Sequence, residues 1–542
     1  MGGLGEIGKN MTVVAYKDSL LVVDAGLAFP DDEMLGVDVV IPDFTYLLER
    51  QEQVAGVLLT HGHEDHVGAL PYLLRDLPVP VYGTRFTLGI VKAKLKEYKL
   101  ELHQDSREIQ PGRWFHLGPF RIFPVRVTHS VPDAVGYGIE TPAGLVVFTG
   151  DYKFDQTPVD GKGPDYDGLV ELGRRGVLAM CGDSTNAERP GFTPSEREVG
   201  HTITEVFRQA PGRVIMATFA SNIHRLQQAI DAAHQFNRRV AVVGRSMEET
   251  VAVARELGYL QDRGVIVELQ ELMKLPPERS VILTTGSQGE PMSALSRMAA
   301  AEHRRVELLP GDTVLLAATP VPGNEKLVHR TIDRLFGQGA TVIYGSHAGV
   351  HVSGHGSREE LKLMLNLLRP RYVIPVHGEY RHLIHHAQLA ESVGVPRERI
   401  LIGENGSVFE FSGEEGRIGG RVHAGAVYVD GLGVGDVGNV VLRDRRHLSK
   451  DGIVVVVCAL KKDTGEILSG PEVLTRGFVY VREAEELLEE VRELVISVVD
   501  ACRERQVVEW PAIKNKVRDA LQDMLYNRTH RRPLILPIIL EI

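Results

Sequence analysis

The sequence is poor in cysteine, in long apolar runs and in basic charge, and each shortage excludes a class of protein. Its 542 residues include three cysteines, Cys181, Cys458 and Cys502. No two of them are close in the sequence, which argues against a disulfide framework and against a cysteine-rich zinc site. A reducing cytoplasm is therefore the expected compartment.

Apolar runs are too short for a membrane span. The run 453–460 is far shorter than the roughly 20 residues that a membrane helix needs. The glycine-rich N-terminus lacks the apolar segment of a signal peptide. We expect a cytoplasmic protein that does not enter a membrane.

Basic residues are outnumbered, with 61 Lys and Arg against 72 Asp and Glu, a net charge of −11. This excludes a protein that binds nucleic acid by bulk charge, although it says nothing about a local basic groove. The 43% of hydrophobic and 25% of charged residues are typical of a folded protein. At about 150 residues per domain, the length predicts three or four domains.

The expected strands and helices divide the chain into three parts. Up to about residue 150, short β-rich runs broken by Gly, Pro and Asp predict a sandwich of sheets. From about Thr193, strand-like runs alternate with helical stretches, which is typical of a parallel sheet covered by helices. These runs are 213–219, 239–243, 265–269, 280–285, 313–318 and 341–344. From about Asp436 the order is strand, strand, helix, helix, strand.

The N-terminal glycines Gly3, Gly5 and Gly8 fit the G-x-G-x-x-G pattern of dinucleotide-binding proteins, with Asp24 as the ribose-binding acid. That function requires a strand before the glycines and a helix after them. Almost nothing precedes them here, and residues 12–16 are predicted to be a strand. We therefore interpret the glycines as a turn packed against another segment.

A dense group of metal-binding side chains follows the expected strand 54–60. His61, His63, Asp65 and His66 fall within six residues, between this strand and a helix. Imidazole nitrogens and carboxylate oxygens suit zinc or manganese. Alternate residues of an extended segment point the same way, so His61 and His63 can share one ion, and Asp65 and His66 can reach a second. The alternative is a solvated polar loop, but such loops seldom concentrate four donors.

Two further donors end expected strands. His129 follows the strand 122–128, and Asp151 follows 145–150. Alone, each would more often be structural, but beside the first cluster metal binding is the better interpretation. Asp151 has two carboxylate oxygens and can bridge the two ions.

The H-x-H-x-D-H segment, the strand-end histidine and Thr149-Gly150-Asp151 together resemble the metallo-β-lactamase superfamily. The fold of that superfamily is an αββα sandwich with one or two metals at its edge, and most members supply a last histidine near the end of the fold. The match here is His377, which lies 226 residues after Asp151 (377 minus 151). The resemblance therefore implies that an α/β domain is inserted into the catalytic fold.

Three further motifs are similar to those of the β-CASP nucleases and, among these, of the ribonuclease J family. They are Gly182-Asp183-Ser184-Thr185, His351-Val352-Ser353-Gly354-His355 and Pro375-Val376-His377-Gly378. The likeness extends from Gly2 to Ile542. It implies a metallo-β-lactamase domain in two parts (1–195 and 356–436), an inserted α/β β-CASP domain (196–355), a linker (437–460) and a small α+β C-terminal domain (461–542).

The resemblance also implies a metal-dependent ribonuclease with endonuclease and 5′-to-3′ exonuclease activity. It would prefer single-stranded RNA with a 5′-monophosphate and act in mRNA decay and rRNA maturation, alone or with partners of an RNA-degradation complex. Two divalent ions, Zn²⁺ or Mn²⁺, would activate a hydroxide that attacks the phosphodiester, leaving a 5′-phosphate and a 3′-hydroxyl. The expected ligands are His61, His63 and His129 for one ion, Asp65, His66 and His377 for the other, and Asp151 for both.

Other residues would act around the ions. By the same resemblance, His355 would stabilise the transition state or protonate the leaving oxygen. Asp183 would orient this histidine or a ligand, Asp24 would act similarly, and Asp65 counts with His355 and Asp183 among the catalytic residues.

A pocket for the 5′-phosphate is expected a short distance from the metals. Ala220, Ser221 and Asn222 lie between a strand and a helix, where backbone N–H groups can bind an anion. A plain helix N-cap is an equally good interpretation from the sequence alone. The other side of the pocket would be formed by His351, Val352, Ser353, Gly354 and His355.

Three further features allow predictions. His382, His385 and His386 are interpreted as one solvated face of a helix. Gly36, Asp38 and Asp430 resemble an accessory site for Ca²⁺ or Mn²⁺ in some family members. An apolar stripe in 487–498 predicts either self-association to a homodimer or tetramer, or the core of the C-terminal domain itself.

Other functions are compatible with parts of the sequence. A thioesterase or lactonase on the same sandwich would need no inserted domain. A β-CASP nuclease acting on DNA would differ in its substrate. A catalytically silent RNA-binding scaffold is disfavoured, because all seven metal-ligand positions are filled.

Overall fold

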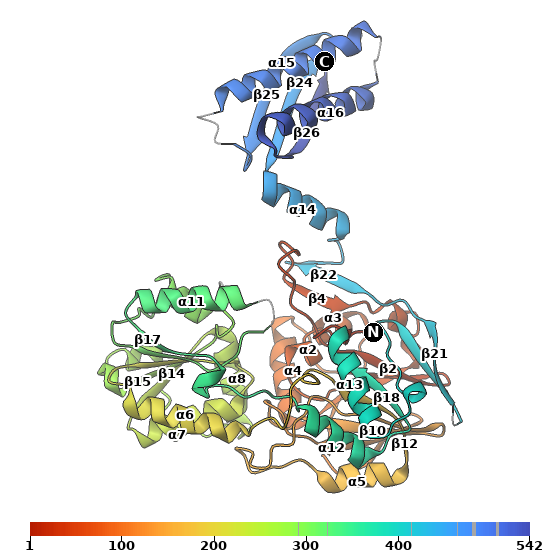
Figure 1. Ribbon diagram of the computed structural model, residues 1–542, viewed down its shortest axis with the longest axis vertical. Coiled ribbons are helices and arrows are strands. Elements are labelled where there is room, and N and C mark those ends of the chain that lie inside the picture. Colours follow the sequence, from red (N-terminus) through yellow and green to blue (C-terminus); the bar gives the residue numbers. More distant parts are fainter. Residues whose placement is uncertain (291, 322–323, 414, 463, 480–483, 506–508) are drawn as a thin grey trace. The chain divides into compact units, whose positions relative to one another are not determined.

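The computed structural model describes residues 1–290, 292–321, 324–413, 415–462, 464–479, 484–505 and 509–542. It divides into two compact units, one of residues 1–29 and 40–427, the other of residues 30–39 and 428–542. Both units contain helices and sheets (Figure 1).

Two sheets stack face to face in the first unit. One has the strand order β2-β3-β5-β6-β7 and the other β18-β12-β11-β10-β9-β8. The strands of the first sheet, in the order just given, are Thr12–Tyr16, Ser19–Val23, Val54–Leu58, Val81–Gly83 and Arg107–Glu108. The second comprises Tyr372–Val376, Val177–Asp183, Gly144–Phe148, Val135–Thr141, Phe120–Arg126 and Phe115–Leu117. Leu21 and Leu58 from one sheet share a buried core with Ile122 and Tyr137 from the other, because alternate strand residues face the same side.

Helices cover the outer faces of this sandwich. The outer face of the second sheet packs on α5 (Tyr166–Arg175), α12 (Arg358–Leu368) and α13 (Tyr380–Ser392). On the first sheet, α3 (Leu70–Asp76) contacts α4 (Arg85–Glu97), which contacts β6. The predicted αββα sandwich is confirmed.

The inserted domain is a five-stranded parallel sheet with the order β14-β15-β13-β16-β17. Its strands are Arg239–Val243, Ser280–Thr284, Val214–Ala217, Thr313–Leu316 and Thr341–Ile343. One face packs on α6 (Glu196–Gln209), α7 (Ile223–Gln235) and α8 (Arg245–Glu256). The other packs on α9 (Leu269–Leu272), α10 (Ala294–Ala299) and α11 (Glu325–Gly337).

One expected strand of this domain did not form. The run 265–269 makes an isolated bridge between Ile266 and Val240, and the chain then leaves the sheet because Glu268 is already the N-cap of α9. The remaining five strand predictions are correct.

The inserted domain leaves and rejoins the sandwich between neighbouring strands. β12 and β18 pair in parallel, with Ala179 opposite Tyr372 and Asp183 opposite Val376. The whole insert is therefore the connection between two adjacent parallel strands.

The second unit contains α14 (Asn439–Asp451) and a sheet of order β25-β24-β26. The strands are Ile467–Arg476, Ile453–Leu460 and Leu534–Glu541, and α15 (Glu485–Glu504) and α16 (Trp510–Thr529) share their core. The central strand β24 lies within the linker 437–460 that the resemblance implied, whereas it fits the order of elements predicted from about Asp436. An eight-residue run of apolar and β-branched residues forms a strand whenever a partner strand is available.

The apolar stripe on α15 packs inside this unit. Leu488, Val491 and Val495 are buried in its core, and Leu487, Leu494 and Val498 pack against it. The stripe is therefore the core of the domain, one of its two predicted roles.

The three cysteines are buried and form no disulfide. Within the described ranges, no helix combines the length and apolar character needed to cross a bilayer.

Candidate metal centre

The predicted ligands meet at the carboxyl ends of the sandwich strands. His61 and His63 follow β5, and Asp65 and His66 lie in the short helix α2 (Glu64–Val67). The remaining three follow β9, β11 and β18, and are His129, Asp151 and His377. The structure thus brings together all seven side chains as two groups that share Asp151, and within each group the ligand atoms lie within 4.8 Å of one another.

The first group contains three converging imidazole nitrogens. His63 Nδ1 lies 3.0 Å from His61 Nε2 and 3.1 Å from His129 Nε2. Asp151 Oδ2 lies 3.6 Å from His61 Nε2 and 3.8 Å from His129 Nε2. Ligands at about 2.0–2.1 Å from a tetrahedral zinc ion would be about 3.3 Å apart. The spacing fits one ion held by three imidazoles and a carboxylate.

The second group has two imidazoles and two carboxylates. Asp65 Oδ2 lies 3.1 Å from His377 Nε2 and 3.6 Å from His66 Nε2. Asp151 Oδ2 lies 3.2 Å from His66 Nε2. The same Asp151 oxygen therefore faces both groups, as a bridging ligand would.

In four of the five histidines, the outer ring nitrogen forms a hydrogen bond, and this bond determines whether the inner nitrogen presents a lone pair to the centre. His66 Nδ1 donates to Asp24 Oδ2 at 2.8 Å, and His129 Nδ1 donates to the Gly354 carbonyl at 2.8 Å. Both acceptors lack a hydrogen, so each ring must carry its proton on Nδ1 and present the Nε2 lone pair to the centre.

His61 and His377 are fixed in the same way through threonine hydroxyls. Thr60 donates to Asp24 at 2.9 Å and Thr185 donates to Asp183 at 2.8 Å. Each hydroxyl is then free to accept from Nδ1 of a ring, His61 at 3.0 Å and His377 at 2.8 Å. Four of the five histidines thus present Nε2 lone pairs, which is the donor set that divalent zinc or manganese requires.

The two groups differ in their electrostatics. Burial holds the pKa of His61 and of His129 well below the ordinary value and lowers the pKa of His63 to about 4, so these rings are neutral. Burial also opposes protonation of His66 and His377. The carboxylates outweigh it, led by Asp151, and raise the pKa of His66 well above its ordinary value and that of His377 to about 10. The second group therefore attracts positive charge strongly.

His355 is in neither of these two groups, but with Asp151, Asp183 and His377 it forms a third group whose ligand atoms converge. Its Nδ1 donates to Asp183 Oδ2 at 2.7 Å, its Nε2 lies 4.0 Å from Asp151 Oδ2, and its ring stacks on that of His377. Burial opposes protonation, but Asp183 and Asp151 raise the pKa of His355. A histidine that carries a proton next to the centre can act as a general acid.

Asp183 contacts two histidines of the site, His355 and His377. One oxygen accepts from His355, and the other lies 3.3 Å from His377 Nδ1 and accepts from Thr185. It therefore orients two rings at once, where the sequence suggested one or the other.

Several supporting residues were not predicted from the sequence. Asn10 donates from Nδ2 to the Asp65 carbonyl at 3.1 Å, and Thr60 and Thr185 anchor ring nitrogens. Thr60 adjoins the predicted histidine cluster and Thr185 lies within the predicted motif 182–185, which was the available signal, whereas Asn10 is more than 50 residues from its partner.

The glycine-rich N-terminal segment packs against the metal-binding loop. β1 (Leu4–Gly5) pairs with β19 (Gly378–Glu379), and the backbone N–H of Asn10 donates to the Asp65 carbonyl at 3.0 Å. No helix follows the glycines, and β2 comes next. The segment is the packed turn that the sequence indicated.

The residues expected to bind a 5′-phosphate lie at the start of α7. Asn222 is the N-cap, accepting from the Arg225 backbone N–H at 3.1 Å, so the plain cap interpretation holds for this side chain. Arg225 Nη1 donates to His351 Nδ1 at 3.0 Å, which brings the two halves of the predicted pocket together. Ala220 and Val352 pack against one core, and Ser353 accepts from Asn186 at 2.9 Å.

Arg225 is fully buried and bound by Glu196 through two hydrogen bonds of 2.7 Å. Its charge is therefore balanced within the protein. Burial and this arginine lower the pKa of His351 to about 3, so the ring is neutral. Arg225 itself therefore has no uncompensated charge to offer a phosphate.

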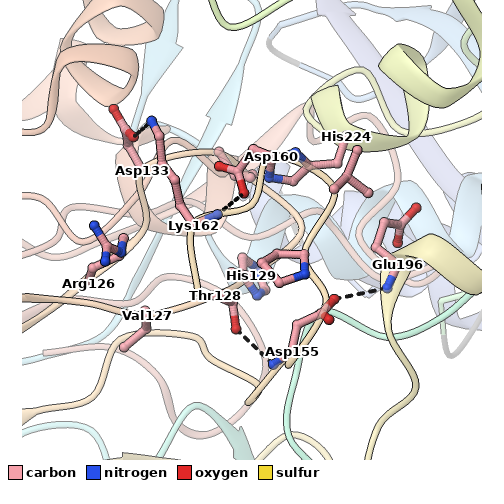
Figure 2. Close-up of a pocket in the computed structure, with 13 residues that line it drawn as sticks. Arg126, Val127, Thr128, His129, Asp133, Asp155, Asp160, Lys162, Glu196 and His224 are labelled. Carbon is pink, nitrogen blue, oxygen red and sulfur yellow. Dashed lines mark hydrogen bonds and ion pairs between the residues drawn. The ribbon is translucent and has the colours of Figure 1, made fainter. Parts of the chain in front are cut away.

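A pocket opens beside His129, where the sandwich meets the inserted domain (Figure 2). Its walls come from residues 126–133 and 155–162 of the sandwich and from Glu196 and His224 of the insert. Acidic and basic side chains alternate around it, and Lys162 pairs with Asp133.

The prediction that His382, His385 and His386 form a solvated face is wrong for two of them. His386 is fully buried and its Nδ1 donates to Ser184 Oγ at 2.9 Å, while the buried His382 accepts from the Glu379 backbone N–H. Only His385 is half exposed. The reason is that this side of α13 lies against the end of β12, as the contact with Ser184 shows.

The accessory metal site is not supported. Arg445 donates to Asp430 and to the Leu35 carbonyl, and a Cβ on Gly36 would meet its guanidinium at 2.6 Å. Asp38 accepts from the Gly431 backbone N–H at 2.8 Å. A guanidinium already supplies the positive charge at this place, and the metal-ligating clusters found among the described residues include neither aspartate.

Comparison with known proteins assigns most of the chain. Residues 4–199 match the metallo-beta-lactamase superfamily and 211–335 the ribonuclease J beta-CASP domain. Residues 342–400 match the Zn-dependent metallo-hydrolase RNA specificity domain, and 440–542 the ribonuclease J C-terminal domain.

Similar curated proteins span the full chain. Ribonuclease J2 of Bacillus subtilis (strain 168) is 48% identical over all of this chain and 98% of its own length. Ribonuclease J of Thermus thermophilus is 45% identical over all of this chain and 94% of its own length. A solved protein of unknown function from Enterococcus faecalis V583, 16% identical, shares the fold over 77% of this chain and 98% of its own, with a TM-score of 0.52.

Proposed function

The chain belongs to the ribonuclease J family, and from this premise we propose that it is a metal-dependent hydrolase that cuts RNA phosphodiester bonds. The observation that carries the proposal is the convergence of seven ligands with four ring nitrogens fixed from outside. The same residues argue against a catalytically silent scaffold, because a binding protein has no need of them.

The roles of the side chains follow from their positions. We assign His61, His63 and His129 to one zinc or manganese ion, Asp65, His66 and His377 to a second, and Asp151 to both. Divalent ions held by these residues would supply a water of lowered pKa and would stabilise negative charge on the phosphate. Asp183 holds the Nδ1–H of His355, so that Nε2 can deliver a proton to the leaving oxygen.

The α7 start and the 351–355 segment support a preference for 5′-monophosphate ends. We propose that Ser221 and Ser353, with neighbouring N–H groups, bind the terminal phosphate. The pocket beside His129 is also lined by His224 of α7, and we propose that the end of the RNA enters on this side. Such an arrangement serves 5′-to-3′ exonuclease action in mRNA decay and rRNA maturation, and endonuclease action when no end is bound.

The proposal is tested by degradation of a 5′-monophosphorylated RNA with and without a chelator. Chelation should abolish cleavage, and His63→Ala or Asp65→Ala should lower the rate by about 100-fold or more, since loss of an outer partner of a metal ligand alone costs about 10–100-fold. Both variants should also bind less zinc. The matched control is His116→Ala, an exposed histidine on β8, which should behave as wild type.

Cleavage that survives metal removal, or full activity in both ligand variants, contradicts the mechanism. A single-stranded DNA of the same sequence separates the two nuclease alternatives. We expect RNA to be cut faster, whereas equal rates would favour a nuclease that acts on DNA.

A further inference from the structure

Glu360 makes more contacts than its place in a helix requires. It lies in the first turn of α12, is fully buried, and completes a capping box with Ser357 by accepting the Ser357 backbone N–H at 2.8 Å. Its carboxylate also accepts the Phe154 N–H and the Thr193 N–H, each at 2.7 Å. Helix capping explains the first contact and neither of the other two.

Each of the three contacted segments carries a residue of the metal centre or its surroundings. Phe154 lies three residues after Asp151, and Thr193 lies ten residues after Asp183. Ser357 follows His355 by two residues. One buried carboxylate thus joins three chain segments that meet at the site.

Hydrogen bonds continue from these segments to the histidines. Thr193 Oγ1 donates to the His355 carbonyl at 2.7 Å, and the Gly356 N–H donates to the Tyr152 carbonyl at 2.6 Å. The neighbouring Gly354 carbonyl accepts His129 Nδ1–H. Displacement of 354–357 would therefore disturb both the orientation of a metal ligand and the position of His355.

The chemistry of the contact favours a carboxylate over any other side chain. Three N–H donors need at least three acceptor lone pairs within one buried group, and a carboxylate has about four and no hydrogen. Hydrogen bonds to an ionised acceptor are stronger than neutral ones. An amide of the same shape would turn an N–H₂ group toward backbone N–H groups.

We propose that Glu360 is a positioning residue for the metal centre, holding the returning end of the inserted domain so that Gly354 orients His129 and His355 stays on Asp183. It touches neither metal nor substrate. The first test of this inference is zinc binding without RNA, which does not depend on the proposed function. The second test, RNA cleavage, rests on the proposed function.

The decisive variant is Glu360→Gln, purified as the full chain. Zinc affinity, measured by competition with a chelator, should fall by about 10–100-fold, the usual effect of losing an outer partner of a metal ligand. With saturating zinc, kcat on 5′-monophosphorylated RNA should fall about tenfold while KM changes little. The matched control is Glu359→Gln, whose half-exposed carboxylate pairs with Lys362 and which should match wild type.

A second variant covers the case in which Glu360→Gln does not fold. Thr193→Val keeps the side-chain shape and the backbone contact to Glu360 but removes the hydroxyl that holds the His355 carbonyl. It should lower kcat without changing KM. Wild-type zinc affinity and wild-type kcat in the folded variants would overturn the proposal, whereas failure of wild type to cut RNA would overturn the proposed function and leave the zinc result standing.

Discussion

At the scale of single residues, the metal centre depends on groups that never face it. Asp24, Thr60, Thr185 and the Gly354 carbonyl each fix an outer ring nitrogen. The histidines themselves are evident from their spacing, and Asp24 was recognised as a supporting residue. The contacts of Asn10 with Asp65 and of Thr185 with His377 could not be predicted, because a hydrogen bond between residues far apart in sequence leaves no local pattern.

The buried His386 should make the stability of the protein depend on pH. Burial lowers its pKa to about 4, so the folded state holds it neutral while an unfolded chain protonates it below about pH 6.5. Its contribution to stability is complete above about pH 6.5 and is lost as the pH falls through the folded pKa. It should amount to about 2 kcal/mol between pH 7.5 and pH 5.

Urea unfolding at these two pH values measures the effect. His386→Gln retains a donor for Ser184 but does not titrate, so its loss of stability on acidification should be smaller than that of wild type by about 2 kcal/mol. His385→Gln, on the half-exposed side of α13, serves as the control. Equal pH dependence in wild type and His386→Gln would show that the ring does not stay neutral.

At the scale of elements, strand ends carry the chemistry and apolar patterns locate them well. The strands before His61, His129, Asp151 and His377 were all predicted from short apolar runs. The run 265–269 had the same composition and failed, because only an isolated bridge pairs it with β14. Strand pairing is decided by neighbours in space, which composition does not record.

The start of α7 is where substrate preference can be tested. Ser221→Ala combined with Ser353→Ala should reduce discrimination between 5′-monophosphate and 5′-hydroxyl RNA by about tenfold or more, since each hydrogen bond to a charged group contributes about 1.5–3 kcal/mol. The measurement is the ratio of kcat/KM for the two RNAs. Ser293→Ala removes a side-chain cap at α10 in the same domain and should leave the ratio unchanged. An unchanged ratio in the double variant would remove these serines from the phosphate pocket.

At the scale of the whole molecule, the insertion into the metallo-β-lactamase domain was predictable, but the start of the C-terminal domain was not. The distance between Asp151 and His377 implied an insertion, which β12 and β18 confirm by pairing across it. The linker 437–460 was implied by the family resemblance, yet it contains α14 and the central strand of the C-terminal sheet.

The two units should respond differently to metal removal. All seven ligands belong to the first unit, and the second has its own core. Zinc at about 100 times its Kd should stabilise the first unit by about 2.7 kcal/mol. In calorimetry, the unfolding transition of the first unit should therefore move to lower temperature with a chelator while that of the second stays in place. A shift of both together would show that they unfold as one.

The pairing of β12 with β18 also determines when the centre is completed during synthesis. A ribosome adds about 5–20 residues each second, so His377 emerges about 10–45 s after Asp151. Until then the nascent chain carries the ligands of the first group but lacks the last histidine of the second. A nascent chain that has not yet been extended past His377 therefore cannot assemble the two-ion centre.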